Sequence, residues 1–123
     1  MKVVNLTQHN PTAAQMDAGV LTRDQYQESE MKQLLTFASI PDRVEIGYRV
    51  NAIVRIAKES GCEAAMIGGA PYLMGPLEKG LRFARITPLY SFTERKSIEI
   101  EKDGVVSKSV VFEHIGWVES AAI

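Results

Sequence analysis

The sequence predicts an α/β domain with a parallel sheet and a C-terminal antiparallel β-hairpin. Two short apolar runs, residues 2–6 and 64–67, alternate with segments of helical periodicity. Strands separated by helices form parallel sheets through right-handed crossovers. Near the C-terminus, an alternating stretch followed by Asp103-Gly104 is typical of a hairpin with a two-residue turn. We therefore expect a small Rossmann-like three-layer fold in a single domain, residues 1–123.

The composition is that of an ordinary globular domain and excludes several protein classes. The chain has 123 residues, of which 46% are hydrophobic and 24% are charged, with a formal net charge of −1. This charge gives no basic field for long nucleic acid, and no apolar run approaches the roughly 20 residues that cross a bilayer. The N-terminus does not have the pattern of a signal peptide. A single cysteine, Cys62, and two distant histidines predict no disulfide, no metal site and no cofactor. We expect a cytoplasmic protein.

The N-terminal third predicts one strand and two helices. Residues 2–6 form a β-prone run, and a polar loop, residues 7–11, follows. Thr12 is expected to cap a short helix over residues 13–18, which Gly19 ends. A second helix is expected from about residue 23 to 37, with Thr22 as its cap. Its shared apolar face consists of Met31, Leu34, Leu35 and Ala38.

The central segment carries the clearest helical pattern. A third helix is expected over about residues 41–60, with Pro41 in its first turn and Gly61 at its end. Its apolar stripe consists of Ile46, Val50, Ile53, Val54 and Ala57. Residues 64–67 are continuously apolar, which predicts a buried strand. A fourth helix is expected over about residues 71–83, with Pro76 near its first turn.

The C-terminal segment predicts a third strand over residues 86–92 and then a hairpin. The hairpin strands are residues 97–101 and 105–112, joined by the Asp103-Gly104 turn. This turn places Glu99 opposite Lys108 as a cross-strand ion pair. We expect the third strand to end at Phe92, so that Ser91–Arg95 forms its exit.

Three polar segments are expected to meet at one edge of the sheet. Ligands of open parallel sheets lie beyond the carboxyl ends of the strands, and these ends are residues 7–10, 68–72 and 91–95. Small side chains at Gly68, Gly69 and Ala70 let a ligand approach the backbone, and the helix that follows offers free N–H groups to a phosphate. The alternative for the two glycines is tight turn chemistry and close helix–sheet packing. Neither common nucleotide-binding glycine motif is present.

The first strand end carries four polar side chains: Thr7, Gln8, His9 and Asn10. They can bind bases or orient a hydroxyl group, or they can cap the helix that follows. His9 is a candidate general base; the alternative is a solvated hydrogen-bonding group.

Arg95 is the cation expected near the third strand end. It follows Thr93 and Glu94, and its guanidinium can hold a phosphate through two hydrogen bonds. The alternative is an ion pair with Glu94 or with Glu113.

The remaining aromatic and histidine side chains admit structural interpretations. Tyr72, Tyr90 and Phe92 can stack on a base or belong to the core. His114 is expected on the face of Val110 and Phe112, in a structural role. No Ser-His-Asp order is apparent.

The order of short motifs along most of the chain resembles a known group of proteins. These motifs are Leu6-Thr7 with Gln15, Ile40-Pro41, residues 65–70, residues 88–95, Asp103-Gly104 and residues 111–114. They resemble the small stand-alone CARF-like proteins associated with type III CRISPR systems, several of which are ring nucleases. The chain is also similar to small proteins of prophages and mobile elements.

The resemblance implies a Rossmann-like homodimer in antiviral defence that binds a cyclic oligoadenylate across its two-fold axis. Active members cleave the ring without a metal, by attack of a ribose 2′-hydroxyl on the adjacent phosphate. The matched ligand-facing residues are Thr7, Gln8, His9, Asn10, Gly68, Gly69, Ala70, Tyr72 and Thr93, with Arg95 as the basic residue. His9 and Arg95 are the catalytic candidates. The chain departs from the pattern in having no lysine in the Gly-Gly loop.

Two other functions are compatible with the same sequence. A chain without an effector domain can sequester a nucleotide without cleaving it. It can also serve as an interaction module, whose hairpin, residues 97–112, presents an edge to a protein partner.

Overall fold

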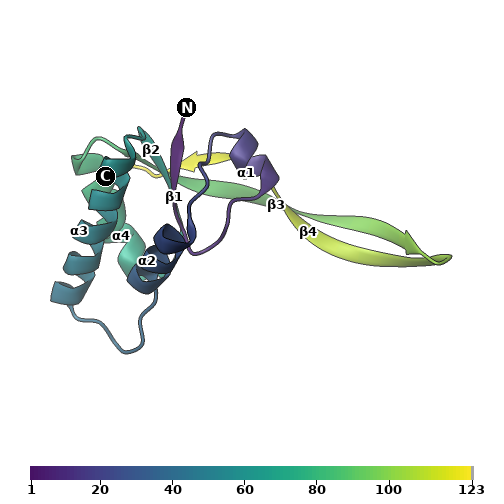
Figure 1. Ribbon diagram of the computed structural model, residues 1–123, viewed down its shortest axis with the longest axis horizontal. Coiled ribbons are helices and arrows are strands. Elements are labelled where there is room, and N and C mark those ends of the chain that lie inside the picture. The colour runs from purple at the N-terminus through teal and green to yellow at the C-terminus, as the bar shows by residue number, and fades with distance from the viewer. Residues whose placement is uncertain (123) are drawn as a thin grey trace.

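The computed structural model describes residues 1–122 and forms one four-stranded open sheet with helices. The elements are β1 (Val3–Leu6), α1 (Ala13–Asp17), α2 (Gln25–Leu35), α3 (Arg43–Ser60), β2 (Ala64–Ile67), α4 (Pro71–Phe83), β3 (Thr87–Lys102) and β4 (Val105–Glu119). The strand order is β1-β2-β3-β4 (Figure 1), with β1, β2 and β3 parallel and β4 antiparallel to β3. The predicted α/β class, with a parallel sheet and an antiparallel C-terminal pair, is confirmed. The predicted three-layer arrangement is not, because α2, α3 and α4 share one core on one face of the sheet.

The three longer helices pack on one face of the sheet. Their buried side chains form the main core with the β1 residues Val4 and Leu6 and the β2 residues Ala65 and Ile67. A sheet that grows in one direction through right-handed crossovers carries its helices on one face, and this strand order is of that kind. The opposite face has a smaller apolar cluster, made of Val3, Val20, Ala64, Met66, Leu89 and Trp117. The short helix α1 packs against β4.

The helix boundaries agree with prediction except at two N-termini and at the end of α2, which stops at Leu35 and not near residue 37. Thr12 caps α1 in a capping box, as predicted. The predicted cap Thr22 is wrong: Asp24 caps α2 and forms a capping box with Gln27, because its carboxylate accepts from the Gln27 backbone N–H at 2.8 Å. Asp42 caps α3, so Pro41 precedes the helix and does not lie in its first turn.

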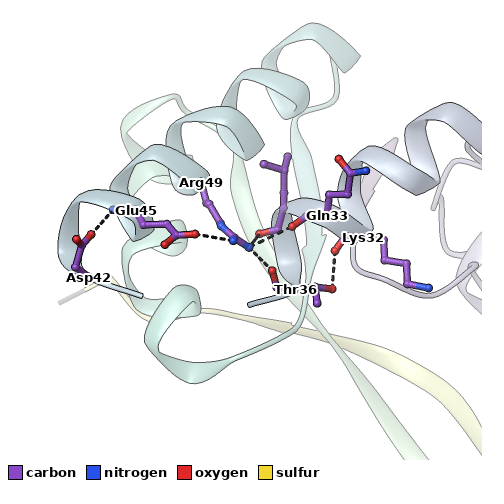
Figure 2. A network of polar contacts seen from close by, with 7 residues as sticks. Lys32, Gln33, Thr36, Asp42, Glu45 and Arg49 are labelled. Carbon is purple, nitrogen blue, oxygen red and sulfur yellow. Dashed lines mark hydrogen bonds and ion pairs between the residues drawn. The ribbon is translucent and has the colours of Figure 1, made fainter. Parts of the chain in front are cut away.

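Arg49 of α3 holds the end of α2 (Figure 2). Its Nη1 donates to the carbonyl groups of Gln33 and Leu34, each at 3.2 Å, and to the carbonyl of Thr36. Its Nη2 pairs with Glu45 at 2.7 Å. The last carbonyl groups of a helix have no partner within that helix, and a cation there also complements the helix dipole. One side chain therefore fixes how α2 docks on α3.

The buried faces of α3 and α4 are the predicted ones. Val50, Ile53 and Ala57 of α3 are buried, as are Leu73, Leu77 and Leu81 of α4. The predicted end of α3 is also confirmed, because Gly61 adopts the left-handed conformation with φ 72°.

The predicted end of the third strand at Phe92 is wrong. β3 continues to Lys102, although its pairing with β2 stops at Leu89. Beyond the sheet, β3 and β4 form a long two-stranded arm, residues 93–113, which projects away from the helices (Figure 1). β4 pairs with the other edge of β3 as far as Lys102, so the strand continues after its pairing with β2 has ended.

The arm ends in the predicted turn with the predicted register. Asp103 and Gly104 have φ values of 53° and 75°, as a two-residue turn of type I′ requires. Glu99 lies opposite Lys108, which confirms the expected register. These two side chains do not form the predicted ion pair; on the arm, Lys96 instead pairs with Glu113 at 2.5 Å.

Candidate functional site

A hollow opens at the carboxyl ends of β1 and β2, beside β3. Its volume is about 450 Å³, within the range of about 300–1,000 Å³ that is common for small-molecule sites. We call it the strand-end hollow. It is lined by Thr7, Gln8, His9, Gln15, Met66, Ile67, Gly68, Gly69, Tyr90 and Ser91.

The structure brings half of the predicted site residues to this hollow. Those that line it are Thr7, Gln8, His9, Gly68 and Gly69. Those outside its lining are Asn10, Ala70, Tyr72, Thr93 and Arg95. The first two segments meet as predicted, because the carboxyl ends of parallel neighbours share an edge.

The residues outside the lining have other structural positions. Ala70 is the N-cap of α4, and the ring of Tyr72 packs edge-on against Phe37, with 5.3 Å between the centroids. Thr93 and Arg95 lie on the arm, because β3 does not end before them. Arg95 therefore does not supply a cation to the hollow of its own chain.

The two glycines of the β2–α4 junction have different surroundings. A Cβ atom on Gly69 would lie 3.4 Å from Met74 Cε, and the residue has φ +153°. Turn geometry and core packing therefore both account for Gly69. A Cβ atom on Gly68 would instead lie 3.7 Å from Thr7 Cγ2, on the side of the hollow.

Asn5 builds the loop that carries the polar side chains. It is only 1% exposed. Its Oδ1 accepts from the Thr7 backbone N–H at 2.9 Å and from Thr7 Oγ1 at 2.7 Å, and its Nδ2 donates to the His9 carbonyl at 2.9 Å. A buried amide with its hydrogen bonds made in this way holds the loop in one conformation.

Arg23 also stabilises this loop, through hydrogen bonds to its backbone carbonyl groups. Its Nη1 donates to the carbonyl groups of Asn5 at 3.0 Å and Thr7 at 2.7 Å, and its Nη2 donates to the His9 carbonyl at 3.2 Å. Burial lowers the pKa of Arg23, and the charge of Glu28 opposes that change. The sequence did not point to Arg23, because it lies outside the segments that follow the strands.

A chain of hydrogen bonds runs from α1 through the wall of the hollow to β4. Gln15 Nε2 donates to Ser91 Oγ at 3.2 Å, and Ser91 Oγ lies 2.5 Å from His114 Nδ1. His114 is 9% exposed, and its ring centroid lies 4.5 Å from that of Trp117. The hollow therefore includes a serine hydroxyl bonded to a histidine.

A β-bulge creates this arrangement. Phe92 pairs with Gly116, whereas Thr93 pairs with His114, so Ile115 is an extra residue in β4. Side chains alternate along a strand, and one extra residue reverses the alternation. The bulge thus puts His114 on the face that carries Trp117 and Ser91.

On the arm side of the bulge, His114 keeps the predicted face. It pairs with Thr93, while Phe112 and Val110 pair with Arg95 and Ser97. His114 therefore shares a face with Phe112 and Val110, as expected from alternation.

Tyr90 lines the hollow and donates a hydrogen bond to Glu78 Oε2 at 2.7 Å. Burial raises the pKa of Tyr90, and the hydrogen bond and charge of Glu78 raise it further. The neutral phenol is thus favoured in the folded protein, so its contribution to stability is complete below the ordinary tyrosine pKa of about 10. That contribution is lost as the pH rises from there toward the raised folded-state pKa.

Tyr90→Phe is therefore expected to reduce the loss of stability at alkaline pH. Urea unfolding at pH 8 and pH 11 measures this, and the variant should lose less free energy of unfolding between the two than the original chain. Tyr26→Phe, which removes an exposed phenol, should leave the alkaline loss unchanged. Parallel losses for the Tyr90 variant and the original chain would contradict the assignment.

The lining of the hollow combines polar side chains with the apolar side chains of Met66 and Ile67. It offers hydroxyl groups, side-chain amides, an imidazole and a phenol, and none of its residues is Lys or Arg. Within residues 1–122, no group of three or more His, Cys, Asp or Glu side chains is placed to hold a metal. Such a lining suits ribose hydroxyls and the edges of bases.

Comparison with known proteins places the chain in a family. No curated protein and no solved structure matches it. In the described part of the chain, no helix has the length and apolar character needed to span a bilayer. A family model with the description "Uncharacterized protein MJ1673 family" matches residues 1–118. Because that match covers nearly the whole sequence, the chain belongs to the MJ1673 family.

Proposed function

We propose that the strand-end hollow binds one nucleotide unit of a cyclic oligoadenylate. The observation that supports this most is the gathering of Thr7, Gln8 and His9 with Gly68 and Gly69 in one hollow. The hollow lies at the carboxyl ends of parallel strands, where open α/β sheets bind ligands. The likeness of the motif order to Rossmann-like CARF proteins also supports it. A cyclic oligoadenylate is built from identical units. In the proposed homodimer, each copy binds one unit, and the two copies share one ring across the two-fold axis.

The proposed reaction is metal-independent cleavage of the ring, as in a ring nuclease. A ribose 2′-oxygen attacks the adjacent phosphorus, the P–O5′ bond breaks, and the product ends in a 2′,3′-cyclic phosphate. The protein contributes by holding the 2′-oxygen in line with the leaving oxygen. His9 is exposed in the hollow, and its imidazole accepts the 2′-hydroxyl proton.

Incubation with cyclic tetra-adenylate in EDTA tests this proposal. Linear products with a 2′,3′-cyclic phosphate, separated by chromatography, would support cleavage. An intact ring with a raised melting temperature of the protein would instead show a binding module that sequesters the ring. An intact ring and an unchanged melting temperature would overturn the proposal.

The arm favours a second role, in protein–protein pairing. β3 pairs with β2 only as far as Leu89. Beyond that residue, β3 continues without β2 along this edge. The arm exposes several large apolar side chains, including Ile98, Ile100 and Phe112, the last 67% exposed. A long apolar edge strand is a template for pairing with another chain. We propose that its partner is a second copy of this chain, in a contact separate from the one that would share the ring.

The charge pattern of the β3 edge fits an antiparallel copy of itself. When two β3 strands pair about Ile98, Glu94 of one copy faces Lys102 of the other. In the same register Arg95 faces Glu101. Opposite charges placed directly opposite stabilise antiparallel pairs by about 0.2–1 kcal/mol each, and the two-fold axis makes each pair occur twice.

Lys102→Glu is expected to weaken this dimer, because it places two carboxylates opposite each other. Adding Glu94→Lys to the same chain should restore the dimer, since the two charges are then exchanged. Light scattering over a concentration series measures the mass. Lys79→Glu makes the same charge change on an exposed residue of α4 and should have no effect. A monomeric original chain, or a double variant as weak as the single one, would contradict the pairing.

A further inference from the structure

One histidine lines the strand-end hollow, and the other contacts a residue of its lining. The sequence contains two, and alone they gave no sign of acting together. His9 lines the hollow directly. His114 reaches it through Ser91, whose Oγ lies 2.5 Å from His114 Nδ1 and whose residue lines the hollow.

The contacts of Ser91 direct its hydroxyl hydrogen into the hollow when His114 is protonated. A serine oxygen accepts two hydrogen bonds and donates one. One acceptor position is taken by Gln15 Nε2 at 3.2 Å. A protonated His114 donates through Nδ1 and takes the other position, which leaves the Ser91 hydrogen for a ligand.

The surroundings of His114 hold its ring in this position. Trp117 packs against the ring at 4.5 Å with an interplanar angle of 60°. Trp117 pairs with Ser91, and the bulge at Ile115 puts His114 on the same face. β-bulges commonly re-aim side chains beside active sites. A serine hydroxyl is a poor acid alone, but an imidazolium behind it replaces the proton that it gives away.

We infer that Ser91 protonates the leaving 5′-oxygen and that His114 resupplies Ser91, an inference that rests on the proposed function. The O2′–P bond forms as His9 takes the 2′-hydroxyl proton. The P–O5′ bond breaks, its electron pair goes to O5′, and O5′ takes the Ser91 hydrogen while Ser91 takes the His114 Nδ1 proton. His9 ends protonated and His114 neutral, and exchange with water resets both.

A change of leaving group tests the inference. Two substrates are compared: cyclic tetra-adenylate, and the same ring with sulfur in place of each bridging 5′-oxygen. A thiolate leaves without being protonated, so it needs no acid. Ser91→Ala and His114→Gln should slow cleavage of the oxygen ring by about 10²–10⁴-fold and leave cleavage of the sulfur ring nearly unchanged. Ser91→Thr, which retains a hydroxyl, should cleave both rings.

Each remaining outcome decides against the inference or against its premise. Equal losses on the two rings would show that Ser91 and His114 act only in structure. No loss for either variant on the oxygen ring would also overturn the inference, while the proposed function would stand. Failure of the original chain to cleave either ring would overturn both. The melting temperatures of the variants show whether a slow variant is still folded and has lost only its general acid.

Discussion

Asn5→Asp is expected to lower the free energy of unfolding by about 3 kcal/mol, because it buries a charge and replaces the amide group that donates to the His9 carbonyl with an oxygen. Asn5 is 1% exposed, and its Nδ2 donates to the His9 carbonyl at 2.9 Å. A carboxylate cannot donate there, so two oxygens would face each other. The loss should shrink at acidic pH, where a protonated carboxyl donates to the His9 carbonyl.

Urea unfolding at pH 7 and pH 5 measures the effect of Asn5→Asp. Asn51→Asp is the matched control, because Asn51 is an exposed residue of α3, and a surface change of this kind is usually within about 0.5 kcal/mol. The Asn5 variant should also lose nucleotide binding, because the loop that carries Thr7 and His9 loses its internal support. A variant as stable as the control would mean that Asn5 does not hold the loop.

His9→Ala is expected to slow ring cleavage by about 10²–10⁴-fold, the usual contribution of a general base. The fold should be unaffected, because the residue is exposed and the bonds that fix the loop use its backbone: the carbonyl accepts from Asn5 and Arg23. The ring of His9 is therefore free for chemistry.

Single-turnover cleavage and nucleotide affinity are the measurements for His9→Ala. Affinity should change much less than the rate, since the lost group acts mainly in the transition state. Asn10→Ala is the control, because Asn10 is the next residue and lies outside the lining of the hollow. If both variants cleave at the original rate, His9 has no part in the reaction.

Much of the helical architecture was predictable from local pattern. The stripes of α3 and α4, the Thr12 cap and the Gly61 stop depend on residues within a few positions of one another, so the sequence reveals them. The cap of α2 was misplaced because Thr22 and Asp24 are both good N-caps. In the structure Asp24 is the cap, and Arg23, between the two candidates, reaches back to the β1 loop.

The length of β3 was not predictable in the same way. The polar residues Thr93–Lys96 lie between two apolar runs, a pattern that is typical of a loop. In the structure β4 pairs with this segment and satisfies its backbone. Because β3 continues through this segment, Thr93 and Arg95 lie on the arm and not in the lining of the hollow.

By itself, the sequence determined the alternation of strands and helices, the hairpin turn, and the meeting of residues 7–9 with residues 68–69. These follow from periodicity and from the shared edge of parallel strands. Ser91 was among the strand-end residues expected at that edge, but the tertiary structure alone decided that Gln15 and His114 contact it, because the three residues come from separate elements. A one-residue bulge in β4 sets which way His114 points, and the position of a bulge depends on how two strands pair.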